Sequence, residues 1–317
     1  MIAPDVIVNC NARRLGDRSP IRAAILDEAR RGGARVHETR SLEELDRAAR
    51  AIAQRGTRAV VLAGGDGAHM AGLSALARAF DGALPRVALA PGGTVCTVAR
   101  NFGMRGPGQA WAQRVVRAAC GAATRIEKRA TLRVRDDAGG DRVGFIFGAG
   151  LVARFFDAYY AEPAPGLARA ARIAARVFAG SLVGSPDAEA MLGRTACSLE
   201  VDGEIVGPGD ARGWSLVLAS VVRDVGLHIL ATYRAGEQPG RFHVVASGLP
   251  PRALGRQVPR VLSGRPMRGE PNVDALARTL VVAFEEENAY VLDGDVMRAR
   301  EARIEAGPEI AVLLPDP

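Results

Sequence analysis

Two glycine-rich segments each follow a β-rich run and have the composition of a phosphate-binding loop. The first, GGDG, occupies 64–67 after the run 59–63, and the second, PGGT, occupies 91–94 after the run 87–90. Glycines let the backbone turn tightly and bring N–H groups close to phosphate oxygens, and the N-terminus of a following helix favours an anion. A carboxylate inside such a loop suggests a metal ion or a hydroxyl proton to handle, so we expect Asp66 to be catalytic.

A third segment places two carboxylates late in the chain. Asp293 and Asp295 flank Gly294 directly after the β-rich run 290–292. A turn at this point would direct both carboxylates to a common mouth, which suits a general base or Mg²⁺ ligands. An ordinary Asp-Gly hairpin turn accounts for the same residues, and the spacing alone does not separate the two interpretations.

The elements that must position these loops change character along the chain. Up to about Arg125, strands are predicted at 6–9, 35–38, 59–62 and 87–90, and helices at 21–31, 42–55, 71–80 and 108–119. Alternation of strand and helix is typical of a doubly wound parallel sheet. Loops after adjacent strands of such a sheet converge at its carboxyl edge, where ligands bind. Both glycine loops are therefore expected at one edge.

The second region is predicted to be mostly antiparallel sheet. Its β-rich runs are 131–135, 144–147, 198–201, 215–221, 241–246, 279–284 and 290–292, and two helical segments, 167–182 and 252–262, interrupt them. Closely spaced strands without regular intervening helices favour a β-sandwich. We therefore predict two domains, 1–125 and 126–317.

The amino-acid composition limits the classes of binding partner to expect. The formal net charge is +7, and Lys128 is the one lysine among 42 basic residues, so nearly all positive charge is arginine. Arginine suits phosphate groups on a nucleotide, a nucleic acid or an anionic lipid, although biased amino-acid usage would produce the same surplus. Aromatic residues make up 5% of the chain and no zinc module is present, so nucleic acid is not expected as a partner.

Two predicted helices carry arginines at helical spacing. They are Arg169, Arg172 and Arg176 in the first, and Arg252, Arg256 and Arg260 in the second. Basic amphipathic helices lie well in an anionic membrane interface, so these six arginines are membrane-facing candidates. A solvated helix face whose apolar side packs on the sheet is the alternative.

The order of the three motifs resembles the diacylglycerol kinase catalytic family, which includes bacterial lipid kinases and the sphingosine and ceramide kinases. GGDG is followed by PGGT-x-x-x-x-A-R at 91–100 and then by the late D-G-D, so the resemblance spans nearly the whole chain. NAD kinases and phosphofructokinases share only GGDG. The resemblance implies an N-terminal α/β domain of the NAD kinase and diacylglycerol kinase type, followed by a β-sandwich domain with the lipid-acceptor site.

The resemblance also implies roles for individual residues. Asp293 matches the family's general base, and Asp295 stands where glutamate is usual. The implied nucleotide-binding residues are Asn9, Thr39, Gly64, Gly65, Asp66, Gly67, Gly92, Gly93, Thr94 and Asp295. ATP and Mg²⁺, or another divalent cation, are the implied cofactors. The acceptor would be a neutral membrane lipid, diacylglycerol-like or ceramide/sphingoid-like, for a cytoplasmic enzyme that meets the membrane peripherally.

Several residues depart from the family pattern. Ala68, Met70 and Ala71 stand where the first loop usually has threonine, asparagine and an acidic residue, and Cys96 stands where the second has asparagine. The changes remove a phosphate-binding hydroxyl and a potential metal ligand. A catalytically silent protein that binds lipid or nucleotide, or a kinase of a soluble acceptor such as NAD, therefore remain alternatives.

Overall fold

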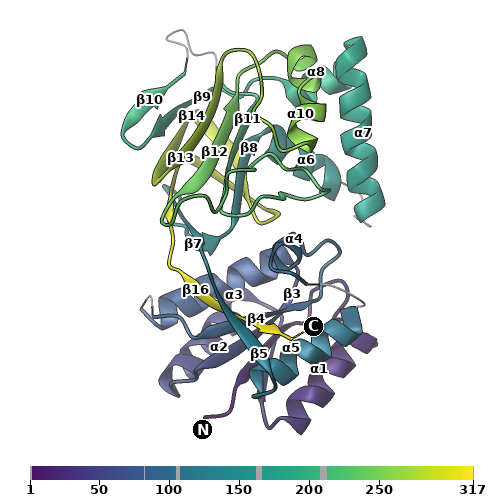
Figure 1. Ribbon diagram of the computed structural model, residues 1–317, viewed down its shortest axis with the longest axis vertical. Coiled ribbons are helices and arrows are strands. Elements are labelled where there is room, and N and C mark those ends of the chain that lie inside the picture. The colour runs from purple at the N-terminus through teal and green to yellow at the C-terminus, as the bar shows by residue number, and fades with distance from the viewer. Residues whose placement is uncertain (1, 82, 105–107, 162–165, 208–212, 317) are drawn as a thin grey trace. The chain divides into compact units, whose positions relative to one another are not determined.

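The chain forms two compact units in the computed structural model, which describes residues 2–81, 83–104, 108–161, 166–207 and 213–316 (Figure 1). Unit 1 comprises Met1–Thr131 and Pro308–Pro317, and unit 2 comprises Leu132–Gly307. The predicted division at 125/126 therefore differs in two places. The strand that contains Arg125 belongs wholly to unit 1, and residues 308–317 belong to unit 1 as well.

Unit 1 is built on a six-stranded sheet in the order β2-β1-β3-β4-β16-β5. Its strands are β1 (Asp5–Asn9), β2 (Arg35–Thr39), β3 (Ala59–Gly64), β4 (Arg86–Pro91), β5 (Thr124–Arg129) and β16 (Ile310–Pro315). The first four pair in parallel, which confirms the predicted parallel sheet. β16 continues the sheet parallel to β4, while β5 runs antiparallel to β16 at the edge.

Helices cover both faces of this sheet, as expected of a doubly wound domain. They are α1 (Pro20–Arg31), α2 (Leu42–Gln54), α3 (Asp66–Ala79), α4 (Thr97–Asn101) and α5 (Gly108–Ala119). α1 packs against α5, and α2 packs against α3 (Figure 1). Serine side chains begin two of them, because Ser19 accepts the amides of Ile21 and Arg22, and Ser41 accepts that of Glu44.

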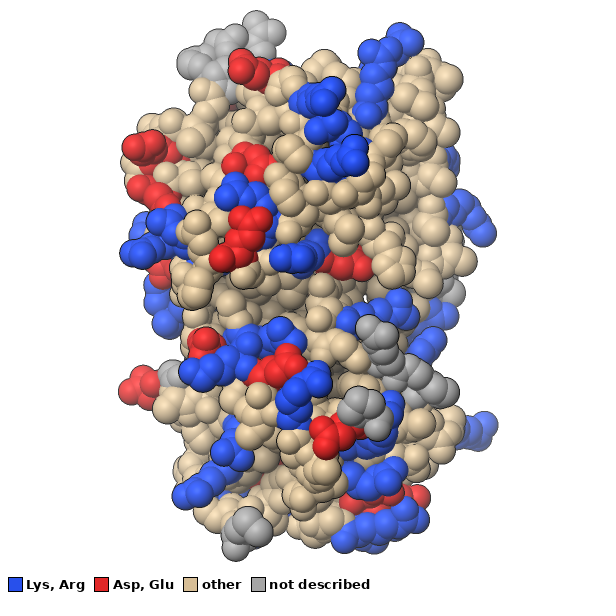
Figure 2. Space-filling model, in the orientation of Figure 1, with Lys and Arg blue, Asp and Glu red and all other residues tan. Residues whose placement is uncertain are grey.

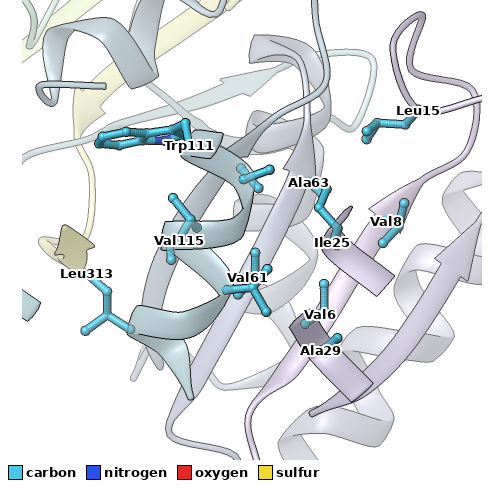
Figure 3. Packing of buried hydrophobic residues seen from close by; sticks show 14 residues of the cluster. Val6, Val8, Leu15, Ile25, Ala29, Val61, Ala63, Trp111, Val115 and Leu313 are labelled. Carbon is cyan, nitrogen blue, oxygen red and sulfur yellow. The ribbon is translucent and has the colours of Figure 1, made fainter. Parts of the chain in front are cut away.

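The core between the sheet and the α1/α5 layer draws on both ends of the chain. Val6 and Val8 from β1, Ile25 from α1 and Trp111 from α5 pack together with Leu313 from β16 (Figure 3). Burial of such side chains is the main stabilising term of a domain. The core of unit 1 therefore includes the last strand of the sequence.

Unit 2 contains the predicted antiparallel sheet, with ten strands in one hydrogen-bonded network. They are β6 (Leu132–Asp136), β7 (Asp141–Gly144), β8 (Ile146–Gly150), β9 (Cys197–Val201), β10 (Glu204–Val206), β11 (Leu216–Ser220), β12 (Phe242–Ser247), β13 (Asn272–Ala277), β14 (Thr279–Leu292) and β15 (Asp295–Ala306). The expected sandwich implied two sheets. One network results because β14 pairs with β9 along its first half and with β8 along its last three residues. The predicted runs 279–284 and 290–292 are both parts of this long strand.

The helices of unit 2 are α6 (Leu151–Tyr160), α7 (Leu167–Val183), α8 (Pro186–Leu192), α9 (Pro251–Gly255) and α10 (Val258–Leu262). α7 matches a predicted helix, whereas the predicted segment 252–262 divides into α9 and α10. α7 packs against α8 and α9, and α6 packs against the sheet. No helix among the described residues combines the length and apolar character that a membrane crossing requires.

Candidate functional site

The predicted nucleotide-binding residues of unit 1 gather at the carboxyl edge of its sheet. Asn9 ends β1 and pairs with Thr39, which ends β2, while Gly64 at the end of β3 pairs with Pro91 at the end of β4. Each glycine loop begins at the last residue of its strand, Gly64 or Pro91. The edge where an open α/β sheet binds ligands therefore carries every one of the predicted unit 1 positions.

A pocket of about 200 Å³ opens at this edge and is lined by Asn9 and Thr39. The rest of its lining consists of Ile7, Asn11, Arg40, Ser41, Leu42, Leu45, Leu62, Ala63, Ala68 and Ala71. An apolar floor with a few polar groups at the rim is the usual composition of a small-molecule site. Sequence reasoning found Asn9 and Thr39 but missed Asn11 and Ser41. Asn11 was signalled by its place just after a strand end, and Ser41 by its place as a helix cap.

The two glycine loops pack directly against each other. The amides of Gly92 and Gly93 both donate to the carbonyl oxygen of Gly64, at 2.7 and 3.1 Å. A Cβ atom on Gly93 would lie 2.5 Å from the Cα atom of Gly65, so a side chain would collide with the facing backbone. The amides of Gly92 and Gly93 are thus used to shape the first loop. Thr94 follows them in the loop and is half-buried.

The first loop leads into the N-terminus of α3. Gly65 is the N-cap and supplies no side-chain hydrogen bond, while Asp66 and Gly67 form the first helical positions. The first four amides of an α-helix have no partner within the helix and carry the positive end of its dipole. This end of α3 can therefore receive an anionic group such as a phosphate.

Asp66 joins the two loops through its carboxylate. Its oxygens accept the backbone amides of Thr97 (2.8 Å) and Val98 (3.0 Å) at the start of α4. Burial raises the pKa of Asp66, while the two amides and the charge of Arg100 favour its ionised form. The structure thus gives Asp66 a positional function as the cap of α4, and its catalytic role stays a prediction.

The residues that depart from the family pattern change what the first loop can bind. Ala68 and Ala71 face the pocket without an oxygen, and Met70 is buried. His69 between them is fully buried, and one ring nitrogen lies 3.2 Å from the carbonyl oxygen of Ala90. Burial lowers the pKa of His69, which favours the neutral imidazole. His69 therefore joins α3 to β4 within the core.

Cys96 occupies a strained position in the second loop. Its φ of 51° lies in the left-handed region, where asparagine is found more readily than most other residues. The side chain is buried, and burial raises the pKa of its thiol to about 11. Asparagine, which the family pattern has at this place, tolerates the left-handed conformation that Cys96 adopts here.

The D-G-D segment in unit 2 forms a two-residue hairpin turn between β14 and β15. Asp293 and Gly294 have φ angles of 50° and 94°, the conformation that favours Asp-Gly in hairpins. The turn between β9 and β10 is built in the same way, with φ angles of 51° at Asp202 and 90° at Gly203. Hairpin geometry therefore explains the Asp-Gly sequence in both places.

Burial distinguishes Asp293 from Asp202. Asp293 is 5% exposed, and its carboxylate accepts the amides of Phe145 (3.0 Å) and Ile146 (2.9 Å) at the start of β8. Asp202 is exposed and accepts the amides of Arg278 and Thr279. These hydrogen bonds hold the carboxylate of Asp293 in place and also anchor the turn. Asp295 is exposed at the start of β15.

No group of three or more His, Cys, Asp or Glu side chains that could hold a metal ion occurs within the described ranges. At the first loop, both oxygens of Asp66 are bonded to amides, and Ala68 and Ala71 offer no ligand atom. Mg²⁺ prefers oxygen ligands and is often held by one or two carboxylates together with substrate phosphates. These residues do not form a preorganised magnesium site.

Two of the six membrane-facing candidates form hydrogen bonds inside unit 2, and the membrane-facing role of all six stays a prediction. The guanidinium of Arg169 donates to the carbonyl oxygens of Ala158 and Tyr159 at the end of α6, and that of Arg260 donates to Pro266. Carbonyls left open at a helix end attract such donors. The other four, Arg172, Arg176, Arg252 and Arg256, are exposed, and Arg176 lies 3.5 Å from Asp187.

The fold and the loops define a two-unit α/β protein whose first unit carries two interlocked glycine loops at the edge of a parallel sheet. Residues 6–127, within its first unit, match the model of the diacylglycerol kinase catalytic domain. The resemblance expected from the motifs is therefore confirmed. No curated protein matches the sequence significantly.

Solved structures share the fold across both units. A putative diacylglycerol kinase from Bacillus anthracis str. Sterne is similar with a TM-score of 0.73 and 15% identity, over 99% of this chain and 95% of that one. A diacylglycerol kinase from the same organism aligns with a TM-score of 0.63 and 12% identity, over 99% of this chain and 97% of that one. At these identities the likeness shows the fold.

Proposed function

We propose that the protein is an ATP-dependent kinase that phosphorylates the hydroxyl group of a neutral membrane lipid. The observation that carries the proposal is the pocket at the carboxyl edge of unit 1, which lies beside the N-terminus of α3 within the domain that matches the kinase family. A pocket for an organic ring next to an anion site is the arrangement that a nucleotide needs.

Unit 1 would hold the nucleotide. The apolar floor of the pocket would receive the base or sugar, with Asn9 and Thr39 as hydrogen-bonding groups. The first-turn amides of α3, from Gly65 to Gly67, would receive the phosphates. Arg100 is exposed beside Asp66 and would add positive charge at the same place.

Unit 2 would bind the acceptor lipid and would supply Asp293 as the general base. The acceptor oxygen bonds to the γ-phosphorus while the bond from that phosphorus to the β-phosphate oxygen breaks, and Asp293 takes the hydroxyl proton. Most of the catalysis in such a transfer is positioning and electrostatics. A divalent cation would partly neutralise the phosphates when bound with the nucleotide.

The surroundings of the D-G-D turn favour an apolar acceptor. The Tyr160 hydroxyl donates to the carbonyl oxygen of Gly294 at 3.0 Å, and a Cβ on Gly294 would lie 3.5 Å from the ring of Phe156. Phe155 and Tyr159 extend this aromatic cluster on α6. Aromatic side chains with a polar tip suit the boundary between a lipid chain and its hydroxyl-bearing headgroup. The phosphate-transfer assay with both kinds of lipid distinguishes a diacylglycerol-like from a ceramide-like acceptor.

The test is transfer of labelled γ-phosphate from ATP to diacylglycerol, ceramide, a sphingoid base and NAD, with Mg²⁺ and mixed micelles. We expect label in one of the lipids. Label in NAD, independent of micelles, would overturn the lipid assignment.

A second candidate, a lipid- or nucleotide-binding protein without catalysis, is favoured by one specific observation. Both carboxylates proposed for chemistry, Asp66 and Asp293, are already bonded to backbone amides. Saturable ATP binding in a filter or calorimetric assay, with no transfer to any hydroxyl lipid, is the result expected of this candidate.

A further inference from the structure

Apolar and arginine side chains lie together on the surface of unit 2 where α7 ends. We define the basic tip as Leu182, Val183, Arg252, Arg256, Leu262, Arg265 and Arg268. Val183 is 81% exposed at the end of α7, and Leu262 is 47% exposed at the end of α10. These aliphatic side chains are exposed at helix ends, and a group of exposed apolar side chains can mark an interaction surface.

Contacts inside unit 2 bring the parts of the basic tip together. A Cβ atom on Gly255 would collide with the Oγ atom of Ser181, so α7 and α9 touch at these two residues. Leu182 directly follows Ser181, and Arg256 directly follows Gly255. The exposed apolar end of α7 and the exposed arginines of α9 are therefore neighbours.

Packing around Met267 attaches the rest of the basic tip. Met267 packs on one cluster with Val177 of α7 and Leu254 of α9, and on another with Val261 of α10. Next to it, the amide of Arg268 donates to the side-chain oxygen of Gln257 at 2.9 Å. The segment that carries Arg265 and Arg268 is thereby fixed beside α9 and α10.

The charge of the basic tip is predominantly positive. Arg252, Arg256, Arg265 and Arg268 are all exposed. Three carboxylates lie in the same region: Asp187 is exposed on α8, Glu189 comes within 3.7 Å of a Cβ placed on Gly184, and Glu270 is exposed after Arg268. Figure 2 shows basic side chains gathered on the viewed face around the position of α10. Arginines outnumber the opposing carboxylates.

We propose that the basic tip docks on a membrane surface that contains anionic lipid, with Leu182, Val183 and Leu262 entering the interface and the arginines meeting lipid phosphates. Apolar side chains next to arginines are complementary to such a surface, which offers hydrocarbon beneath a negative layer. Arginine also forms paired hydrogen bonds to phosphate oxygens. The proposal rests on the proposed lipid kinase function, for which the membrane would be the source of substrate. Vesicle binding, however, can be measured without catalysis.

The test is flotation of the full chain, without nucleotide, on vesicles of phosphatidylcholine alone or mixed with phosphatidylglycerol. We expect the protein to bind the mixed vesicles, and to be released by salt because surface attraction is screened. Arg252→Gln with Arg256→Gln is expected to weaken binding about 30-fold, since each arginine contributes about a factor of five. Val183→Glu is expected to weaken it about tenfold by removing an inserted side chain.

Matched controls separate the basic tip from general charge and exposed apolar surface. Arg47→Gln with Arg50→Gln removes the same charge from exposed positions on α2, and Ile205→Glu changes a side chain that is 84% exposed on β10. Both controls are expected to bind within about twofold of the unmodified protein. Circular dichroism spectra establish that each variant is folded.

Three results would overturn the docking proposal. They are absence of flotation with either vesicle, equal weakening by the controls, and binding of a labelled DNA oligonucleotide through the basic tip without binding of vesicles. The kinase proposal is judged separately, by phosphate transfer to micelle-dispersed lipid, so the failure of one leaves the other measurable.

Discussion

Asp293 has two candidate roles, general base and anchor of its turn, and a mutation can distinguish them. The amides of Phe145 and Ile146, where β8 begins, donate to its carboxylate, and its Asp-Gly turn has ordinary hairpin geometry, so a purely structural aspartate would have the same contacts. Asp202 provides the comparison, because its turn and its amide contacts are alike while it is exposed.

We expect Asp293→Asn to lower turnover in the phosphate-transfer assay by roughly 100-fold to 10,000-fold, the usual contribution of a general base. ATP binding should be retained, because every implied nucleotide-binding residue except Asp295 belongs to unit 1. Asp202→Asn is expected to leave turnover within about twofold. If Asp293→Asn lowers the free energy of unfolding but keeps turnover, Asp293 is an anchor of its turn and another group accepts the proton.

Asp5, at the opposite end of β1 from the pocket, is expected to make the stability of the fold depend on pH. It is fully buried, and its carboxylate lies 2.6 Å from His37, 2.5 Å from Arg55 and 2.6 Å from the hydroxyl of Thr57. Burial alone would raise the pKa of Asp5, but the bonds from His37 and Thr57 and the charge of Arg55 outweigh it and hold the pKa below the usual value. The charged form therefore stabilises the fold.

A carboxyl with a depressed pKa stabilises a protein above its unfolded-state pKa of about 4, and the contribution is lost as pH falls through the folded-state pKa. At pH 7, we expect Asp5→Asn to cost about 2–3 kcal/mol, reduced from a fully buried pair because Arg55 and His37 are partly exposed. Urea unfolding between pH 7 and 3 should show the difference between the two proteins shrinking below about pH 4. A difference that is constant with pH would contradict this role.

At the scale of elements, the carboxyl edge of unit 1 depends on two loops that touch through their backbones. Gly92 and Gly93 bind the carbonyl of Gly64, and Asp66 of the first loop caps α4 after the second. A change in either loop must therefore move the other. The nucleotide site and the stability of this edge are coupled.

We expect Gly93→Ala to lower the free energy of unfolding by about 1–3 kcal/mol, because its Cβ would lie 2.5 Å from the Cα atom of Gly65. ATP binding should weaken at the same time, since α3 begins at this contact. Gly16→Ala is the control, because a Cβ there has no atom within 4 Å. Chemical unfolding and a nucleotide titration measure both effects, and equal behaviour of the two variants would contradict the interlocked-loop description.

On the scale of the whole molecule, the chain leaves unit 1, builds unit 2 and returns. β16 lies between β4 and β5, and the hydroxyl of Thr131 donates to the carbonyl of Pro308 at 2.6 Å where the two crossing segments meet. Unit 1 is therefore incomplete until the last residues of the chain are present.

Truncation after Gly307 is expected to unfold unit 1. It removes the buried side chains of Ile310, Val312, Leu313 and Leu314 and leaves β4 and β5 without a shared neighbour. At about 1.5–3 kcal/mol for each such side chain, the loss is comparable with the stability of an entire domain. Near-ultraviolet circular dichroism and limited proteolysis would report it, with truncation after Pro315 as the control. A folded unit 1 in the shorter chain would show that β16 is dispensable.

Local patterns in the sequence were sufficient for much of the fold. The alternation of β-rich runs with helical stretches predicted β1 to β4, α1, α2 and α5. Such prediction is possible because the spacing of apolar residues along a short segment reflects its own secondary structure. The glycine loops were predicted at one sheet edge for a related reason, since parallel strands share the direction in which they end. The family resemblance of the first unit follows from the same loops.

The tertiary structure alone decided which groups meet over long separations. The return of β16 and the union of 279–284 and 290–292 in one strand depend on pairing partners far away in sequence. The same holds for single side chains: Asp66 and Asp293 find amides 31 and 148 residues away, and Arg169 turns to the end of α6. The division of 252–262 into two helices has a local cause, because Pro259 lies in the first turn of α10. A short sequence pattern encodes the conformation of its own backbone, whereas the partners of a charged side chain are set by where the rest of the chain folds.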